Sequence, residues 1–130
     1  MTGNMTVRNL FLVGAGGFLG SVARYLVAIA LPFSGTGFPF ATFIVNLLGS
    51  FLIGFVSELA VSTTLVSTDV RLFFATGFCG AFTTFSSYMY ENSALIRDGQ
   101  VFYTSLYLAG SVAGGFLSLY FGMAMAKLWS

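Results

Sequence analysis

Four long apolar runs, at about residues 10–31, 40–59, 72–90 and 101–126, limit what this chain can fold into. A helix of about 20 apolar residues crosses the roughly 30 Å hydrocarbon core of a bilayer, and each run is close to that length. Because backbone polar groups in hydrocarbon must be hydrogen-bonded internally, each run is predicted to be helical. We therefore expect an all-α integral membrane protein, with residues 1–130 forming a single domain of four transmembrane helices.

Charged side chains are scarce, which excludes several classes of function. The 130 residues include only 5 Lys or Arg and 4 Asp or Glu, and the net charge is +1. Soluble domains carry about one quarter charged residues, and a nucleic-acid partner would require a basic face. The chain has no histidine and one cysteine, Cys79, so it offers neither a histidine base nor a soft-metal ligand set. No nucleophile and base pair is recognisable, and we do not expect an enzyme.

The third run is unusual because its centre is polar and rich in glycine. From Gly77 to Tyr88 it reads Gly-Phe-Cys-Gly-Ala-Phe-Thr-Thr-Phe-Ser-Ser-Tyr. Glycine loosens a helix, and Thr and Ser hydroxyls can bind the backbone groups that are released. We predict a third helix broken near its middle. Irregular backbone at membrane depth persists where protein buries it or where it lines a wet cavity, so the break predicts an ion or substrate site, with a close-packed helix crossing as the alternative.

The first run combines small residues with a cation. Gly16, Gly20 and Arg24 recur at every fourth position, so they share one helix face, and the glycines suit close contact with another helix. A cation in a membrane helix faces a cavity, pairs with another group, or extends to the interface. The sequence is compatible with two roles for Arg24: a functional residue facing a cavity, or a side chain that extends to the membrane interface.

The second and fourth runs each carry a polar row on one helix face. The second run has small or polar residues at every fourth position: Thr42, Asn46, Ser50 and Gly54. The fourth run has a similar row: Tyr103, Tyr107, Ser111 and Gly115. Burying the amide of Asn46 without partners would be unfavourable. Asn46 therefore predicts either a hydrogen bond between helices or a binding site.

The distribution of cations gives only a weak orientation signal. Four spans would place three cations on one side, namely Arg8, Arg71 and Lys127. Arg97, and Arg24 within the first run, would lie toward the other side. Because cytoplasmic loops usually carry the excess of Lys and Arg, so small a bias favours insertion in both orientations. We expect an antiparallel homodimer whose two-fold axis brings both broken third helices together.

These motifs resemble those of the Fluc/CrcB family of fluoride channels over essentially the whole chain. In order, the matching segments are Gly16-Gly17-x-x-Gly20 with Arg24, Thr42-Phe-Ile-Val-Asn46-Leu-Leu-Gly49-Ser50, Gly77-x-x-Gly80-x-x-Thr83-Thr84-Phe85-Ser86, and Tyr107-x-x-x-Ser111. The resemblance implies an antiparallel, dual-topology homodimer with two fluoride pores and one structural sodium ion at its centre. It also implies passive export of fluoride across a bacterial inner (plasma) membrane, and thereby fluoride resistance.

The resemblance further implies roles for individual residues. The fluoride pore would be formed by Asn46, Phe85, Tyr88, Thr84, Tyr107, Ser111 and Thr42. The backbone carbonyls of Gly80 and Thr83 would bind sodium, which prefers oxygen ligands. Arg24 and Glu91 would line a vestibule. Amide and hydroxyl donors, together with the positive edge of a phenyl ring, suit an anion that must lose its hydration water.

Two positions depart from the family pattern, and two other classes of function remain open. Tyr88 occupies a position where the family commonly has phenylalanine, and Gly115 one where a hydroxyl is common. A small dual-topology multidrug exporter would need a carboxylate within the membrane, whereas Glu58 and Glu91 lie near the ends of predicted spans. A structural subunit of a membrane complex would explain the small-residue rows but not the polar break.

Overall fold

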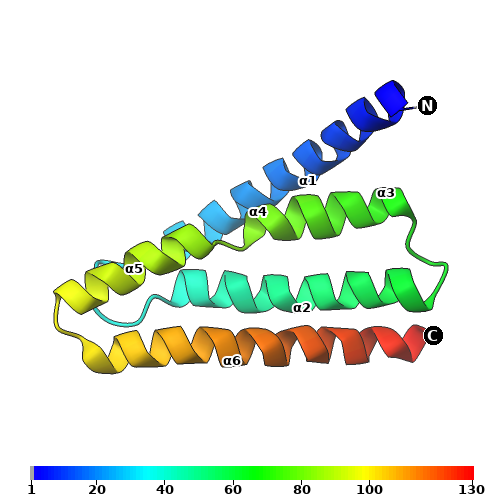
Figure 1. Ribbon diagram of the computed structural model, residues 1–130. Coiled ribbons are helices and arrows are strands. Elements are labelled where there is room, and N and C mark those ends of the chain that lie inside the picture. Colours follow the sequence, from blue (N-terminus) through cyan, green and yellow to red (C-terminus); the bar gives the residue numbers. More distant parts are fainter. Residues whose placement is uncertain (1) are drawn as a thin grey trace.

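The computed structural model describes residues 2–130, and every regular element in that range is a helix (Figure 1). The three longest helices are α1 (Thr2–Ala30), α2 (Phe40–Ser62) and α6 (Val101–Ala126). Between α2 and α6 come four shorter helices: α3 (Thr68–Arg71), the π-helix η1 (Leu72–Cys79), α4 (Gly80–Phe82) and α5 (Phe85–Arg97). A 3₁₀-helix, η2 (Lys127–Trp129), follows α6. The predicted all-α class is confirmed.

Within residues 2–130, three helical stretches are long and apolar enough to cross a membrane. They are Met5–Ala30, Phe40–Ser62 and Val101–Trp129, with mean hydropathy values of 1.6, 2.0 and 1.4. The chain is therefore a helical membrane protein. The third apolar run is divided among η1, α4 and α5, so it does not form one uninterrupted helix.

Helix α1 begins earlier than the first apolar run. The run starts near Leu10, whereas α1 is already helical from Thr2. Residues 2–9 include no proline to prevent a helix from extending backwards. Arg8, in this added part, forms a two-pronged ion pair with Asp69 of α3, in which Nη1 lies 3.1 Å from Oδ1. This contact fastens the start of α1 to the helix that precedes η1.

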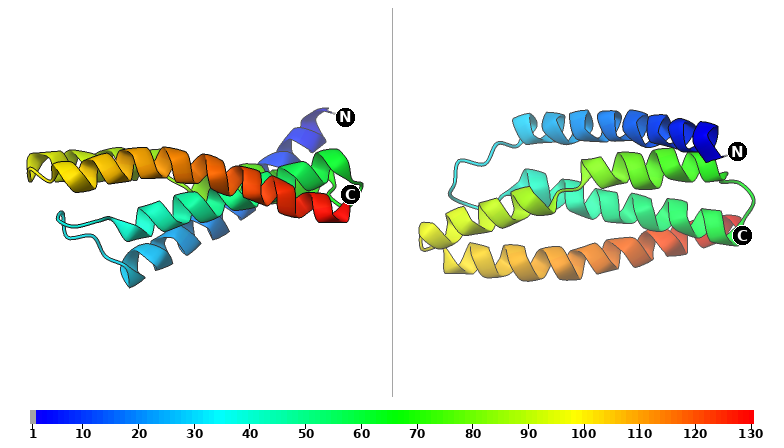
Figure 2. Two further views of the ribbon diagram at one scale, coloured as in Figure 1. Left: turned by 90° about the horizontal axis from the view of Figure 1, so that it is seen from below. Right: turned by 45° about the horizontal axis from the view of Figure 1, so that its top comes forward.

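The helices form two packed groups that share α2. Figures 1 and 2 show α2 and α6 side by side along their length. On the other side α1 packs against η1 and α4, and α5 lies beside the first part of α6. The two ends of the described chain lie at the same end of the bundle (Figure 1). This arrangement places the junction of α4 and α5 over the first half of α2.

Small residues allow these close helix contacts, as the sequence predicts for the first run. A Cβ atom at Gly16 would collide with the carbonyl oxygen of Phe73, and one at Gly20 with that of Phe78. The glycine face of α1 therefore packs directly on the backbone of η1. Gly54 and Gly122 allow α2 and α6 to approach each other in the same way.

Two extended residues separate α4 from α5. Thr83 has φ −84° and ψ 157°, and Thr84 has φ −149° and ψ 122°. The Thr84 side chain accepts a hydrogen bond of 3.2 Å from the backbone N–H of Ser87, which caps the start of α5. At the end of α4, the N–H and hydroxyl of Thr83 both donate to the Cys79 carbonyl, at 3.1 and 2.8 Å. Thr hydroxyls thus satisfy backbone groups on both sides of the break.

Candidate functional site

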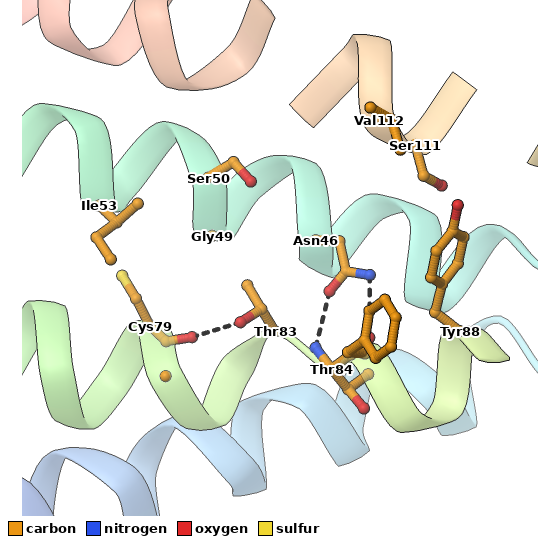
Figure 3. A pocket seen from close by; sticks show the side chains of 12 residues that line it. Asn46, Gly49, Ser50, Ile53, Cys79, Thr83, Thr84, Tyr88, Ser111 and Val112 are labelled. Carbon is orange, nitrogen blue, oxygen red and sulfur yellow. Dashed lines mark hydrogen bonds between the residues drawn. The ribbon is translucent and has the colours of Figure 1, made fainter. Parts of the chain in front are cut away.

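A cavity of about 360 Å³ lies where this break faces α2 and α6 (Figure 3). It is lined by Asn46, Gly49, Ser50, Ile53, Cys79, Gly80, Thr83, Thr84, Phe85, Tyr88, Ser111 and Val112. None of these described residues is charged. The cavity therefore brings together five of the residues predicted for the pore: Asn46, Thr84, Phe85, Tyr88 and Ser111.

Asn46 binds the backbone of the break from α2. Its Oδ1 accepts the N–H of Thr84 at 2.8 Å, and its Nδ2 donates to the carbonyl of Thr84 at 3.2 Å (Figure 3). The side chain thus pairs with both backbone groups of one extended residue. A primary amide has two N–H donors, so one remains for a ligand in the cavity. Asn46 combines a hydrogen bond between helices with a position at the cavity wall.

The two aromatic residues at the start of α5 have different surroundings. Phe85 is 72% exposed in the single chain, and its ring borders the cavity. Tyr88 is 6% exposed, and its hydroxyl donates to the Leu108 carbonyl at 2.8 Å and, more weakly, to that of Tyr107 at 3.4 Å. The Tyr88 and Tyr107 rings meet edge to face, with centroids 4.8 Å apart. The Tyr88 hydroxyl therefore binds the backbone of α6.

Glu91 joins three helices at a second polar cluster. Its Oε1 accepts the Tyr107 hydroxyl at 2.6 Å, and its Oε2 accepts the Thr42 hydroxyl at 2.8 Å. Tyr107 is 0% exposed and Thr42 is buried, so both hydroxyls are enclosed. Charge-assisted bonds of this kind are stronger than neutral ones. Thr42 and Tyr107 thus bind Glu91 and do not line the cavity at the break.

Arg24 points toward the end of α4, next to the break. Its Nε donates to the carbonyl of Ala81 at 3.0 Å. The last carbonyls of a helix lack helical partners, and Arg24 satisfies one at the end of α4. Arg24, Thr42, Thr84 and Glu91 line a smaller cavity of about 80 Å³. Thr84 therefore borders both cavities.

Backbone oxygen atoms are the available ligands for a metal ion near the break. Among the described residues, His, Cys, Asp and Glu side chains form no group of three that could hold a metal. The carbonyls of Gly80 and Thr83 accept none of the hydrogen bonds found outside regular helices in residues 2–130. Gly80 lies on the surface of the chain, where a Cβ would have nothing within 4 Å. These two carbonyls suit a hard cation, which prefers oxygen.

Sequence reasoning missed some contributors to the site. A Cβ at Gly49 would collide with the Thr83 side chain, so this glycine lets the break approach α2. Its position one turn after Asn46 is the signal that could have identified it. The carbonyls of Cys79, Ala81 and Leu108 also accept side-chain donors, and no sequence pattern identifies individual carbonyls.

The fold and cavities define a small helical membrane protein with an uncharged, hydrogen-bonding cavity beside an interrupted helix. Residues 11–123 match the family model described as CrcB-like protein, Camphor Resistance (CrcB). The chain belongs to this family, which confirms the resemblance found in the sequence.

Curated relatives match almost the whole chain. A protein of Chlorobaculum tepidum named "Fluoride-specific ion channel FluC" is 69% identical over 125 residues, which are 96% of this chain and 99% of the relative. A protein of the same name from Chlorobium phaeobacteroides (strain BS1) is 67% identical over 121 residues, covering 93% and 94%. Another, from Methanocaldococcus jannaschii, is 40% identical over 120 residues, covering 92% and 95%. Since these relatives are ion channels, the prediction that this chain is not an enzyme is confirmed.

Proposed function

We propose that this protein is a fluoride-selective channel through which cytoplasmic fluoride leaves passively, down its electrochemical gradient. Relatives named fluoride-specific ion channels, including one that is 69% identical, support this function. Within the chain, the proposal is carried by the uncharged cavity at the break, where hydrogen-bond donors and an aromatic ring meet. The proposed location is a bacterial inner (plasma) membrane, where the channel provides fluoride resistance.

The cavity offers the kinds of group that fluoride requires. Fluoride is small and strongly hydrated, so a pore must replace its water with N–H and O–H donors. The second N–H of Asn46 and the buried hydroxyl of Ser111, which has no partner among the described residues, are such donors. Phe85 adds the positive edge of its ring, and Tyr88 contributes a second ring beside it, with centroids 6.0 Å apart. Neutral donors stabilise the anion without holding it as strongly as a fixed cation would.

The smaller cavity is the proposed vestibule. Thr84 borders both cavities, so a path can continue from one to the other at this residue. Arg24 supplies positive charge that attracts an anion. Glu91 holds the hydroxyls of Thr42 and Tyr107, and an anion entering there competes with its carboxylate for the same two donors.

The proposed assembly is an antiparallel, dual-topology homodimer with two pores. In this proposal the third run also crosses the bilayer, as a helix broken at Thr83 and Thr84. The exposed Phe85 ring supports a second copy, because one wall of the cavity is open in the single chain. Both broken helices would meet at the two-fold axis.

A structural sodium ion at this axis is part of the proposal. The Gly80 and Thr83 carbonyls of both subunits would bind it, and they suit a hard cation without any carboxylate. When bound, the ion would neutralise the oxygen dipoles that face each other across the axis. Gly80 is exposed and uncrowded, which leaves room for a second subunit beside it.

Ion efflux from liposomes tests this function. Purified protein is reconstituted, and fluoride and chloride electrodes record efflux while valinomycin clamps a potassium gradient. Fast fluoride efflux with negligible chloride efflux is expected, and protein-free liposomes are the control. No fluoride efflux from assembled dimers would refute the function, while equal efflux of both ions would refute its selectivity.

A further inference from the structure

The Ser111 hydroxyl is an unusual group in α6. Its Oγ is buried, and it has no hydrogen-bond partner among the described residues. A serine hydroxyl within a helix commonly donates to the carbonyl three or four residues earlier. Thr104, in the same helix, does this with the carbonyl of Gln100 at 2.8 Å. The unpaired Ser111 hydroxyl therefore requires an explanation.

Tyr88 explains why Ser111 lacks its usual partner. The carbonyls three and four residues before Ser111 belong to Leu108 and Tyr107, and these two accept the Tyr88 hydroxyl at 2.8 and 3.4 Å. A carbonyl oxygen has two lone pairs, and within a helix one of them accepts the N–H four residues later. The Tyr88 O–H has one proton, which it donates mainly to Leu108, and its oxygen also lies 3.4 Å from the Tyr107 carbonyl oxygen, so it stands in front of both acceptors. Figure 3 shows this hydroxyl directed at the turn of α6 that carries Ser111.

We infer that Tyr88 is a positioning residue, which keeps the Ser111 hydroxyl free to donate to an anion in the larger cavity. The inference rests on the proposed function and extends it to the residue that controls one of the donors. Tyr88 is hydrogen-bonded to the Leu108 carbonyl and stands beside that of Tyr107, which leaves the Ser111 proton to a ligand or water in the cavity that Ser111 lines. Without the Tyr88 hydroxyl, Ser111 would rotate and bind its own helix.

A double-mutant cycle of Tyr88→Phe and Ser111→Ala tests the coupling, with fluoride efflux from liposomes as the readout. In the wild-type background, Ser111→Ala is expected to lower efflux about two- to tenfold, the range expected for one hydrogen bond. In the Tyr88→Phe background, the same substitution is expected to change efflux by less than about twofold. Equal fold-changes in both backgrounds would overturn the inference.

Two further arms separate this inference from the function on which it rests. If wild-type dimers conduct no fluoride, both the function and the inference are refuted; if they conduct but the cycle shows no coupling, only the inference is refuted.

An experimental structure of Tyr88→Phe gives a readout without flux. Ser111 Oγ within hydrogen-bond distance of the Tyr107 or Leu108 carbonyl supports the inference, and an unpaired Oγ overturns it. Should Tyr88→Phe not assemble, 4-fluorophenylalanine at position 88 fills the same space without an O–H donor and takes its place in both experiments.

Discussion

Replacing Asn46 separates its two roles, because alanine and aspartate remove different groups. Asn46→Ala removes both hydrogen bonds to the Thr84 backbone. Each such bond contributes about 0.5–1.5 kcal/mol net, so we expect a loss of about 1–3 kcal/mol in the free energy of unfolding. The variant also removes the donor that faces the cavity. Fluoride efflux should therefore be largely abolished while the dimer remains assembled.

Asn46→Asp is the matched control for the structural role. A carboxylate keeps an acceptor for the Thr84 N–H at the position of Oδ1, but it places a second oxygen where Nδ2 now donates to the Thr84 carbonyl, and these two oxygens repel each other. It has no donor for an anion, and its negative charge repels one. We expect Asn46→Asp, which keeps the contact with the Thr84 N–H, to be as inactive as Asn46→Ala.

The assays are electrode-recorded fluoride efflux from liposomes and denaturant-induced unfolding of the same preparations in detergent. Dimer content is checked by size-exclusion chromatography before each measurement. Wild-type efflux from correctly assembled Asn46→Asp dimers would refute the reasoning, because the amide donor would then be dispensable. Efflux that falls in Asn46→Ala but persists in Asn46→Asp would show that the hydrogen bond from the Thr84 N–H matters and the amide donor does not.

Three further substitutions test other parts of the structure. Gly20→Ala should destabilise the fold by about 1–3 kcal/mol through collision with the Phe78 carbonyl. Gly14→Ala has open space around it and should be at least as stable as the wild type, because alanine favours a helix. Equal unfolding midpoints for the two variants would contradict the packing. Phe85→Ile removes the ring edge and should lower fluoride efflux about tenfold in intact dimers, and unchanged efflux would remove the ring from the path. A Cβ at Gly80 has room in the single chain, so Gly80→Val should leave the fold of the subunit intact. It should abolish the rise in the dimer's melting temperature that sodium produces relative to N-methylglucamine. A retained sodium effect would count against the central site.

Local sequence pattern predicts the helices and much of their packing. The apolar runs predict the all-α membrane class because hydrocarbon requires internal backbone hydrogen bonds. The spacing of Gly16 and Gly20 predicts a packing face, and both glycines lie against η1. The extended residues Thr83 and Thr84 fall in the stretch whose composition predicts a loosened helix. A break within a membrane span nevertheless remains a proposal.

The partners of the polar side chains could not be predicted in the same way. Asn46 and Thr84 are separated by 38 residues, and Thr42 and Glu91 by 49. Such pairs depend on how whole helices rotate and shift against one another, which no local period determines. The π-helical form of η1 was also not predicted, because its residues have no composition that distinguishes a π-helix from an α-helix.

The break is held from two directions, by Arg24 on α1 and by Asn46 on α2. These contacts lie within one chain, so the extended residues take up their geometry as the subunit folds and need no bound ion. A site assembled in advance loses little entropy when an ion enters, and its dipoles need not reorient. In the proposed channel, therefore, we expect the hydrogen-bonding groups of the cavity to be in place before an ion enters.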